Sequence, residues 1–431
     1  MRVARRVLFG VCIAILALAF VAAGTTMVVA QNGGGIGGWL GEWAAGQITK
    51  LLTTPGEGGI SVGRVGGSLP GRIELHDIAV SDAQGVWTTV DSVTVVWHPL
   101  KLITGTADVD LAEIAGVRVA RLPAGSEKPE TQPAEPFKWP TLPVNLRIDR
   151  FVAEDVRLAE PVIGTAASLR AEGRLAAEES GAARSDLVVE RTDGTPGRIE
   201  AKAEYVPADS FLRLDATVDE PADGLIAHAL QAPDLPPVSL HLAGEGPLSG
   251  WKGKLTAALG DATGLTADLA LARADGDVAV DATGKARVAA MLDPSLRPLI
   301  GDGVDFAVKA RNRGTQILEV ESARATTSAA EVTAAATLDL GQNSVEGQAA
   351  VALRDPAAVQ PFVAPAELDG VTLSARFAGP LTAPEVKAEA RAARVGVPEG
   401  ELRDITAAVA VTPAAPPDPA GFRGTVTADV R

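Results

Sequence analysis

The 431-residue sequence is poor in cysteine and in aromatic residues, which argues against disulfide links and against a wide, densely packed interior. Cys12 is the only cysteine, so no disulfide can link two parts of the chain. Aromatic residues make up 4% of the chain although 46% of it is hydrophobic, so alanine, valine and leucine supply most of the apolar surface. Because protein interiors pack as densely as organic crystals, such small side chains fill a wide interior poorly.

Basic residues are also scarce, since 39 lysines and arginines face 54 acidic residues and give a net charge of −15. Nucleic-acid binding needs a basic surface that releases counterions from phosphates, so no nucleic-acid partner is expected. The histidines lack the spacing of metal ligands, and no HExxH or CxxC motif occurs. We therefore predict no catalytic residue, no metal and no cofactor, and surface strand positions for all four histidines, which are His76, His98, His228 and His241.

Charged residues are absent between Arg6 and Glu42, and the first part of this gap is strongly apolar. A helix of about 24 residues is about 36 Å long, which is enough to cross a hydrocarbon core of about 30 Å. Residues 1–30 are therefore predicted to form a membrane anchor, with its arginines on the cytoplasmic side. A signal peptide cleaved after Ala30 is the open alternative. The predicted anchor residues are Val7, Leu8, Phe9, Ile13, Ile15, Leu16, Leu18 and Phe20.

Residues 31–55 are predicted to form a glycine-rich joint followed by a short amphipathic helix. Apolar residues recur there at near-helical spacing. Two interpretations stay open, because the helix can lie at the membrane interface or cover an open end of the β structure. The residues concerned are Trp39, Leu40, Trp43, Ile48 and Leu51.

The rest of the chain is predicted to be mainly β, with short strands separated by glycine, proline and aspartate turns. Apolar residues alternate with polar ones in Arg72–His76 and Val93–Trp97, as expected of half-buried strands. Ile73 and Ile78 cannot share one face of a regular strand, so a bulge or turn is expected near Asp77. The predicted segments are a first β segment (56–123), a proline-rich loop (124–139), a second β segment (140–235) and a repeat region (236–431).

The repeat region contains similar stretches about 65 residues apart. Asp293-Pro294 and Asp355-Pro356 are 62 residues apart, and Gly303 and Gly370, which precede similar strands, are 67 apart. Each copy is predicted to be a short proline-capped helical plug followed by strands that stack edge to edge. The expected fold is an elongated, groove-shaped sheet after a transmembrane helix.

Two interpretations of the sheet interior stay open: an open or lipid-filled groove, and an ordinary sandwich or solenoid packed with valine, leucine and alanine. The scarcity of bulky residues in the second half favours the groove. The candidates for its apolar lining are Ile73, Leu75, Val93, Val95, Trp97, Leu212, Leu214, Phe306, Val308 and Leu373.

Two motifs give the chain a family resemblance. They are G-x-L-x-G-x-I-x-L-x-x-I-x-V-x-D-x-x-G-x-W, from Gly67 to Trp87, and W-x-P-L-x-L-I-x-G, from Trp97 to Gly105. With the predicted anchor and helix before them, they resemble the TamB family of AsmA-like proteins. The resemblance implies a single-pass inner-membrane protein with most of its chain in the periplasm and a β-groove with an apolar interior.

Members of that family are associated with phospholipid transport to the outer membrane and with the assembly and secretion of proteins there. The resemblance therefore implies phospholipid and an Omp85-class outer-membrane barrel protein as partners. Because family members are much longer, we expect a truncated or fragmentary member that lacks the region contacting the barrel.

Two other functions fit the residues. An exported structural or adhesive β-solenoid needs only the repeats. An exported polysaccharide-acting β-helix enzyme would need paired carboxylates in a cleft, and the acidic residues from Asp261 to Asp281 are its candidates, although they are typical of a solvated strand face.

Overall fold

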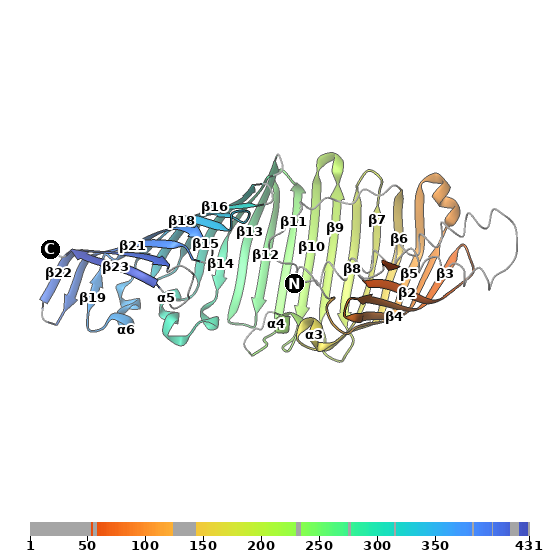
Figure 1. The fold of residues 1–431 in the computed structure, drawn as a ribbon, viewed down its shortest axis with the longest axis horizontal. Coiled ribbons are helices and arrows are strands. Elements are labelled where there is room, and N and C mark those ends of the chain that lie inside the picture. Colours follow the sequence, from red (N-terminus) through yellow and green to blue (C-terminus); the bar gives the residue numbers. More distant parts are fainter. Residues whose placement is uncertain are drawn as a thin grey trace. The chain divides into compact units, whose positions relative to one another are not determined.

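The computed structural model describes residues 53–54, 58–123, 144–229, 234–274, 277–313, 316–381, 383–398, 400–413 and 422–429, and it is mainly β (Figure 1). The chain divides into two units, with unit 1 ending at His241 and unit 2 beginning at Leu242. The predicted anchor, the amphipathic helix and the 124–139 loop lie outside the described residues. None of the described helices is long and apolar enough to cross a bilayer.

Unit 1 is an open sheet in which strands adjacent in sequence pair with each other. The pairs are antiparallel except for β5 and β6, which are parallel, so β6 begins at Asn145 beside Thr106, where β5 began. Short helices occupy some of the connections. The elements are β1 (Thr53–Thr54), β2 (Gly58–Gly66), β3 (Arg72–Asp82), β4 (Gly85–Trp97), η1 (Pro99–Thr104), β5 (Thr106–Val119), β6 (Asn145–Leu158), α3 (Glu160–Ile163), β7 (Ala167–Ala177), β8 (Ala183–Arg191), β9 (Arg198–Val206), η2 (Pro207–Asp209), β10 (Phe211–Glu220) and α4 (Leu225–Ala229).

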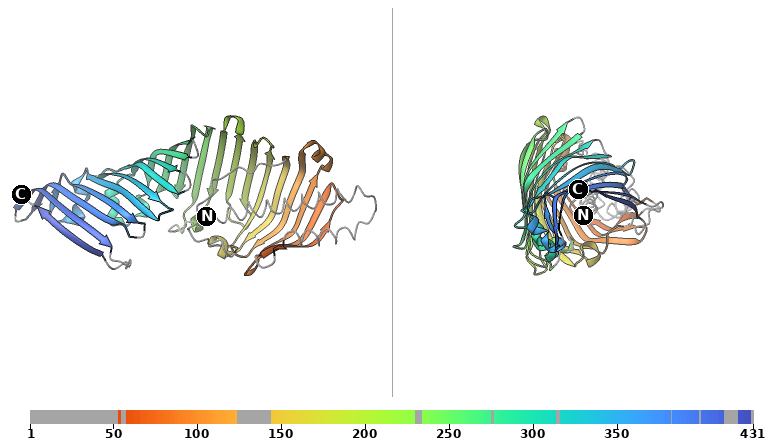
Figure 2. Two further views of the ribbon diagram at one scale, coloured as in Figure 1. Left: turned by 45° about the horizontal axis from the view of Figure 1, so that its top comes forward. Right: turned by 90° about the vertical axis from the view of Figure 1, so that its left-hand side faces the viewer.

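Unit 2 is an antiparallel sheet that follows the chain order from β12 onwards except at β19, because β18 pairs with β20 and β19 pairs with β21; the left view in Figure 2 shows its strands side by side. Strand β11 (Val238–Pro247) runs across the unit boundary. The other elements are β12 (Trp251–Leu259), β13 (Thr263–Ala274), β14 (Asp277–Arg287), η3 (Ala289–Met291), η4 (Pro294–Leu296), α5 (Arg297–Ile300), β15 (Val304–Arg313), β16 (Ile317–Thr326), β17 (Ala330–Asp339), β18 (Ser344–Leu353), η5 (Pro356–Ala358), α6 (Gln360–Val363), β19 (Glu367–Asp369), β20 (Thr372–Pro380), β21 (Glu385–Val397), β22 (Gly400–Pro413) and β23 (Phe422–Asp429).

The predicted repeat is present in unit 2 as two helical connections of the same design. Asp293 accepts a hydrogen bond from the Ser295 amide (2.9 Å), and Asp355 accepts one from the Ala357 amide (3.0 Å). Each aspartate thereby satisfies an amide at a helix start that lacks an intrahelical partner. Figure 1 shows α5 and α6, which follow these caps, at the same edge of the sheet.

A transverse line of irregular residues, here called the crease, crosses β2 to β6 of unit 1. Its members lie at neighbouring register positions, and two aspartates and one glycine among them adopt left-handed backbone, with φ of 55°, 67° and 54° at Asp77, Gly116 and Asp155. Such a residue reverses which face the following side chains occupy. The crease consists of Gly63, Asp77, Asp91, Gly116 and Asp155.

The crease explains how apolar residues at odd and at even sequence positions come to share one face of β3. Ile73 and Leu75 precede Asp77, and Ile78 and Val80 follow it, yet all four are buried. The irregularity at Asp77 is one left-handed residue and not an inserted one, because the register with β2 and β4 is the same on both sides. Strand β3 runs unbroken through this position, so the expected bulge or turn near Asp77 was wrong, and the change of face comes from the left-handed backbone alone.

We expect the Gly116→Ala variant to lower the free energy of unfolding of unit 1 by at least about 2 kcal/mol. A left-handed conformation alone costs a side-chain-bearing residue about 1 to 2 kcal/mol, and a Cβ at this position would also overlap the Asp91 carboxylate. Gly105 is the matched control, because its φ is 77° and a Cβ there would meet nothing within 4 Å. Urea unfolding followed by tryptophan fluorescence tests this, and equal losses for the two variants would contradict it.

Candidate functional site

The strand register aligns side chains of unit 1 into rows perpendicular to the strands, and two neighbouring rows on one face contain only apolar residues and glycine. Because side chains of a strand alternate between faces, one row keeps to one face of the sheet. The row that passes through Leu75 crosses eight strands, from β3 to β10. Its members are Leu75, Val93, Ile114, Ala153, Ala171, Val189, Ile199 and Val218.

A second apolar row runs beside the first, and burial changes along both. Leu75 is 1% exposed and Ala153 in β6 is 7% exposed, whereas Leu187 in β8 is 38% exposed. The rows therefore begin in a packed core and continue as a partly exposed apolar face. The second row is Ile73, Val95, Ala112, Phe151, Gly173, Leu187, Ala201 and Ala216.

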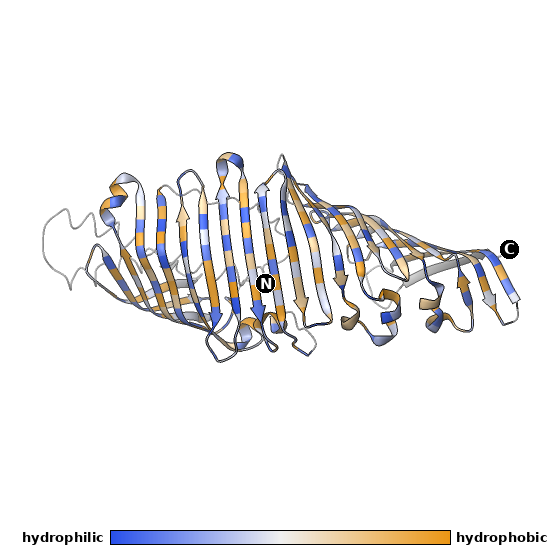
Figure 3. Ribbon diagram, turned by 180° about the vertical axis from the view of Figure 1, so that it is seen from behind, coloured by the Kyte–Doolittle hydropathy of each residue, from blue (hydrophilic) through white to orange (hydrophobic). Residues whose placement is uncertain are grey.

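Unit 2 carries apolar rows of its own across β13 to β22, and Figure 3 shows the alternation of hydrophobic and hydrophilic residues along each strand that produces them. One row is built mainly of alanine, and larger side chains stand in the row beside it. We call the first the alanine row, which comprises Ala323, Ala334, Ala349, Ala375 and Ala388. The neighbouring row contains Phe306, Ala325, Val332, Val351, Leu373 and Ala390. We call the surface formed by both rows the apolar face of unit 2.

Two phenylalanines on this apolar face lie over glycines of the adjacent strand. A Cβ at Gly347 would lie 2.6 Å from Phe377 Cζ, and one at Gly284 would lie 3.0 Å from Phe306 Cζ. Each ring thus covers the backbone that its glycine leaves bare, a pairing known to support strands containing glycine. Because each ring extends over the adjacent strand, it projects little above the apolar face.

The apolar face of unit 2 has no second layer among the described residues. Within unit 2, the strong contacts of the described strands are with their sheet neighbours and the short connecting helices. Leu373 is 46% exposed, Val280 39% and Val332 38%. A sheet with one apolar face normally buries it against another element, so this face is suited to an apolar partner.

The predicted lining residues lie on the apolar faces of their units but differ in burial. Those of β3 and β4, from Ile73 to Trp97, belong to the packed core of unit 1. Leu212 and Leu214 of unit 1 and Phe306 and Val308 of unit 2 are partly exposed, and Leu373 is the most exposed of the ten. The alanine row was missed, because alanine alternating with polar residues gives only a weak hydropathy signal.

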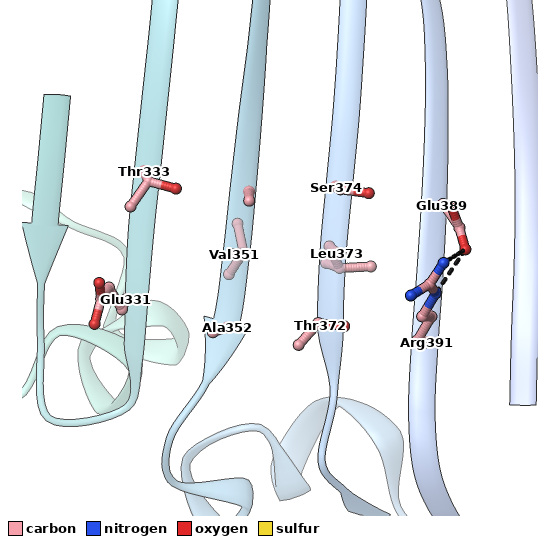
Figure 4. A pocket seen from close by; sticks show the side chains of 10 residues that line it. Glu331, Thr333, Val351, Ala352, Thr372, Leu373, Ser374, Glu389 and Arg391 are labelled. Atoms are coloured by element: carbon pink, nitrogen blue, oxygen red, sulfur yellow. Dashed lines mark hydrogen bonds and ion pairs between the residues drawn. The ribbon is translucent and has the colours of Figure 1, made fainter. Parts of the chain in front are cut away.

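The opposite face of the unit 2 sheet is polar and contains two adjoining hollows. The larger has a volume of about 1040 Å³ and extends from β14 to β22. The smaller, of about 330 Å³, shares Thr333, Ala350, Ser374 and Glu389 with it and is drawn in Figure 4, where Glu389 pairs with Arg391. The larger is lined by alanine and by polar side chains, and the smaller is also bordered by Val351 and Leu373.

His98, Asp108 and Asp110 bring three potential metal-ligand atoms within 4.8 Å of one another. However, the Lys101 ammonium contacts the Asp108 carboxylate and holds its pKa below the ordinary value, and Arg147 lies 3.9 Å from the same carboxylate. These cations already supply the positive charge that a metal ion would provide. The cluster is therefore best explained as an ion-pair network.

The acidic residues considered for polysaccharide chemistry behave as a solvated face where the structure describes them. Asp268 lies 3.7 Å from Lys254, and Asp281 lies 3.2 Å from Lys309 on the adjacent strand. Asp275 lies outside the described residues. Cross-strand ion pairs of this kind are typical of solvent-facing sheet surfaces.

Comparison of the chain with protein-family models, with curated proteins and with solved structures finds no match.

Proposed function

We propose that this chain is an inner-membrane-anchored periplasmic protein whose apolar faces carry the acyl chains of phospholipids on their way to the outer membrane. The observation that supports this most strongly is the continuity of the apolar rows across the strands of each unit. A row perpendicular to the strands lengthens by about 4.8 Å with every strand added. A repeated strand unit thus provides a path of any required length without a new motif.

The composition of the apolar face of unit 2 favours a fluid hydrocarbon over a second protein layer. A protein layer reaches native packing density by fitting bulky side chains into complementary gaps. The short side chains of the alanine row form few such gaps. An acyl chain can follow such a surface, and each fully buried methylene contributes about 0.8 kcal/mol. Weak binding spread over many positions also allows a lipid to move along the row.

The proposed inner-membrane anchor and the proposed outer-membrane destination are both supported by the sequence. Residues 7–30 have the length and the flanking arginines of an inner-membrane anchor, and the motifs from Gly67 to Gly105 resemble those of the TamB family. A role in assembly or secretion of outer-membrane proteins, with an Omp85-class barrel protein as partner, belongs to the same proposal.

Photo-crosslinking at two consecutive residues of β20 tests the proposal. A photoreactive residue at position 373 is expected to label phospholipid in cells at least about tenfold more than one at position 374. The physical reason is that consecutive side chains of a strand point to opposite faces, which puts the Leu373 side chain on the apolar face and the Ser374 side chain on the polar face. Mass spectrometry of the crosslinked adduct provides the measurement.

The pair Val332 and Thr333 repeats the comparison on β17. Equal lipid labelling at 373 and 374, or labelling by protein alone at 373 and 332, would contradict transport. Protein-only labelling would instead fit the structural or adhesive β-solenoid.

A further inference from the structure

Two cations stand directly opposite each other on the polar face of unit 2. Arg376 of β20 faces Lys387 of β21 in the strand register, and both side chains line the larger hollow. No carboxylate of the described residues lies within ion-pair distance of either side chain. Like charges placed opposite each other on a sheet are destabilising, so this pair needs an explanation.

Two other pairs of facing arginines in the chain are neutralised by nearby carboxylates. In unit 2, Arg394 faces Arg403, and Glu401 lies 3.9 Å from the first and 2.7 Å from the second. In unit 1, Arg118 faces Arg157; Asp91 lies 2.5 Å from Arg118, and Asp155 lies 2.8 Å from Arg157. The fold thus neutralises facing cations elsewhere.

The remaining charged side chains around the larger hollow are all paired. The four pairs that involve them are Asp281 with Lys309 at 3.2 Å, Glu321 with Arg311 at 3.0 Å, Arg324 with Glu331 at 3.5 Å and Glu389 with Arg391 at 2.6 Å. Only Arg376 and Lys387, among the charged residues that line this hollow, have no such partner. A chain with a net charge of −15 has no general shortage of carboxylates, so the uncompensated charge is local.

The chemistry of the two cations indicates what would neutralise them. A guanidinium offers a planar fork of donors that matches an oxyanion, and an ammonium adds a compact point charge. Gln348 faces Arg376 from β18, and Ser374 lies two residues before Arg376 on the same face. Both side chains add hydrogen-bonding groups beside the cations.

We propose that Arg376 and Lys387 hold the phosphate of a hydroxyl-bearing phosphate ester in the larger hollow. Its volume of about 1040 Å³ is in the range of small-molecule sites, and its alanine, serine and threonine lining leaves room for a polar ligand. The alanine row also borders the hollow, because three consecutive residues of several strands contribute to it. By alternation, however, the side chains of Arg376 and Lys387 point to the opposite side of the sheet from those of Leu373 and the alanine row. It is therefore a second site and does not depend on the proposed lipid transport.

Calorimetric titration of the full chain in a non-ionic detergent at low ionic strength tests the site, with inorganic phosphate and glycerol 3-phosphate as probes. We expect saturable binding, at least about tenfold weaker in Arg376→Gln and in Lys387→Gln and lost in the double variant. Arg394→Gln is the matched control, because it removes the same charge from a facing pair in the same unit and should leave the affinity unchanged. Circular dichroism should show all variants folded.

Binding should also raise the melting temperature of the wild-type chain but not that of the double variant, because a ligand bound only by the folded state stabilises it. Absence of saturable binding of either probe, or binding retained by the double variant, would overturn the proposal.

Monomeric dihexanoyl phosphatidylglycerol distinguishes the sources of the phosphate. Binding lost in the double variant would identify a lipid headgroup, and binding of glycerol 3-phosphate alone would identify a soluble ester. Lipid crosslinking at position 373 is measured separately, so failure of one proposal leaves the other testable.

Discussion

Replacing Leu75 with aspartate is expected to abolish the folded state of unit 1. Leu75 is 1% exposed and faces Val93 within the packed part of the apolar rows. The change removes a buried leucine, worth about 2 to 5 kcal/mol, and adds an unpaired buried carboxylate, which costs several kcal/mol more. The sum is comparable with the entire stability of a typical domain, about 5 to 15 kcal/mol.

Fluorescence of two core tryptophans provides the measurement, since Trp87 is 6% and Trp97 is 4% exposed. The emission should shift to the red without denaturant. Two controls separate charge from burial: Leu75→Ala should fold with a lower stability, and Leu187→Asp, at a site on the same face that is 38% exposed, should cost less than the change at 75 and leave unit 1 folded. An equal effect of aspartate at 75 and 187 would mean that burial along the rows does not differ as described.

The alternation of apolar and polar residues was enough to predict strands and a face that is apolar throughout. It also showed a conflict of parity near Asp77, but the bulge or turn predicted from that conflict is absent, and a left-handed residue in an unbroken strand resolves it instead. It did not reveal the crease as a whole. The crease depends on which residues of five strands lie side by side, and strand register across the long connection between β5 and β6 is not encoded in a local pattern.

The candidate sites were harder to predict, for two physical reasons. The lining residues were selected by size, so the small members of the alanine row escaped selection although they occupy the same face as Leu373. The facing cations are 11 residues apart in sequence, with a turn between them, and only the pairing of β20 with β21 brings Arg376 opposite Lys387. The absence of a carboxylate is a property of the surroundings, which no motif records.

Aspartate in place of Ala349 is expected to stop lipid movement along unit 2 while leaving the sheet folded. Ala349 lies in the middle of the alanine row, between Ala334 and Ala375 on the adjacent strands. Covering a carboxylate with an acyl chain removes it from water without a partner, at a cost of about 2 kcal/mol or more. Because about 1.4 kcal/mol corresponds to a factor of ten, lipid labelling at position 373 should fall at least about tenfold.

Ala350→Asp is the control for this prediction, since it places the same charge one residue further along β18, where strand alternation puts the side chain on the polar face. Its lipid labelling should match that of the unmodified chain. Both variants should melt within a few degrees of it, because the two alanines are partly exposed and lose little packing. If the two aspartates reduced labelling equally, the effect would be one of charge or stability, and the apolar face would not be the lipid path. If only the change at 349 reduced it, the path would lie on that face, with the charge blocking it at a single strand.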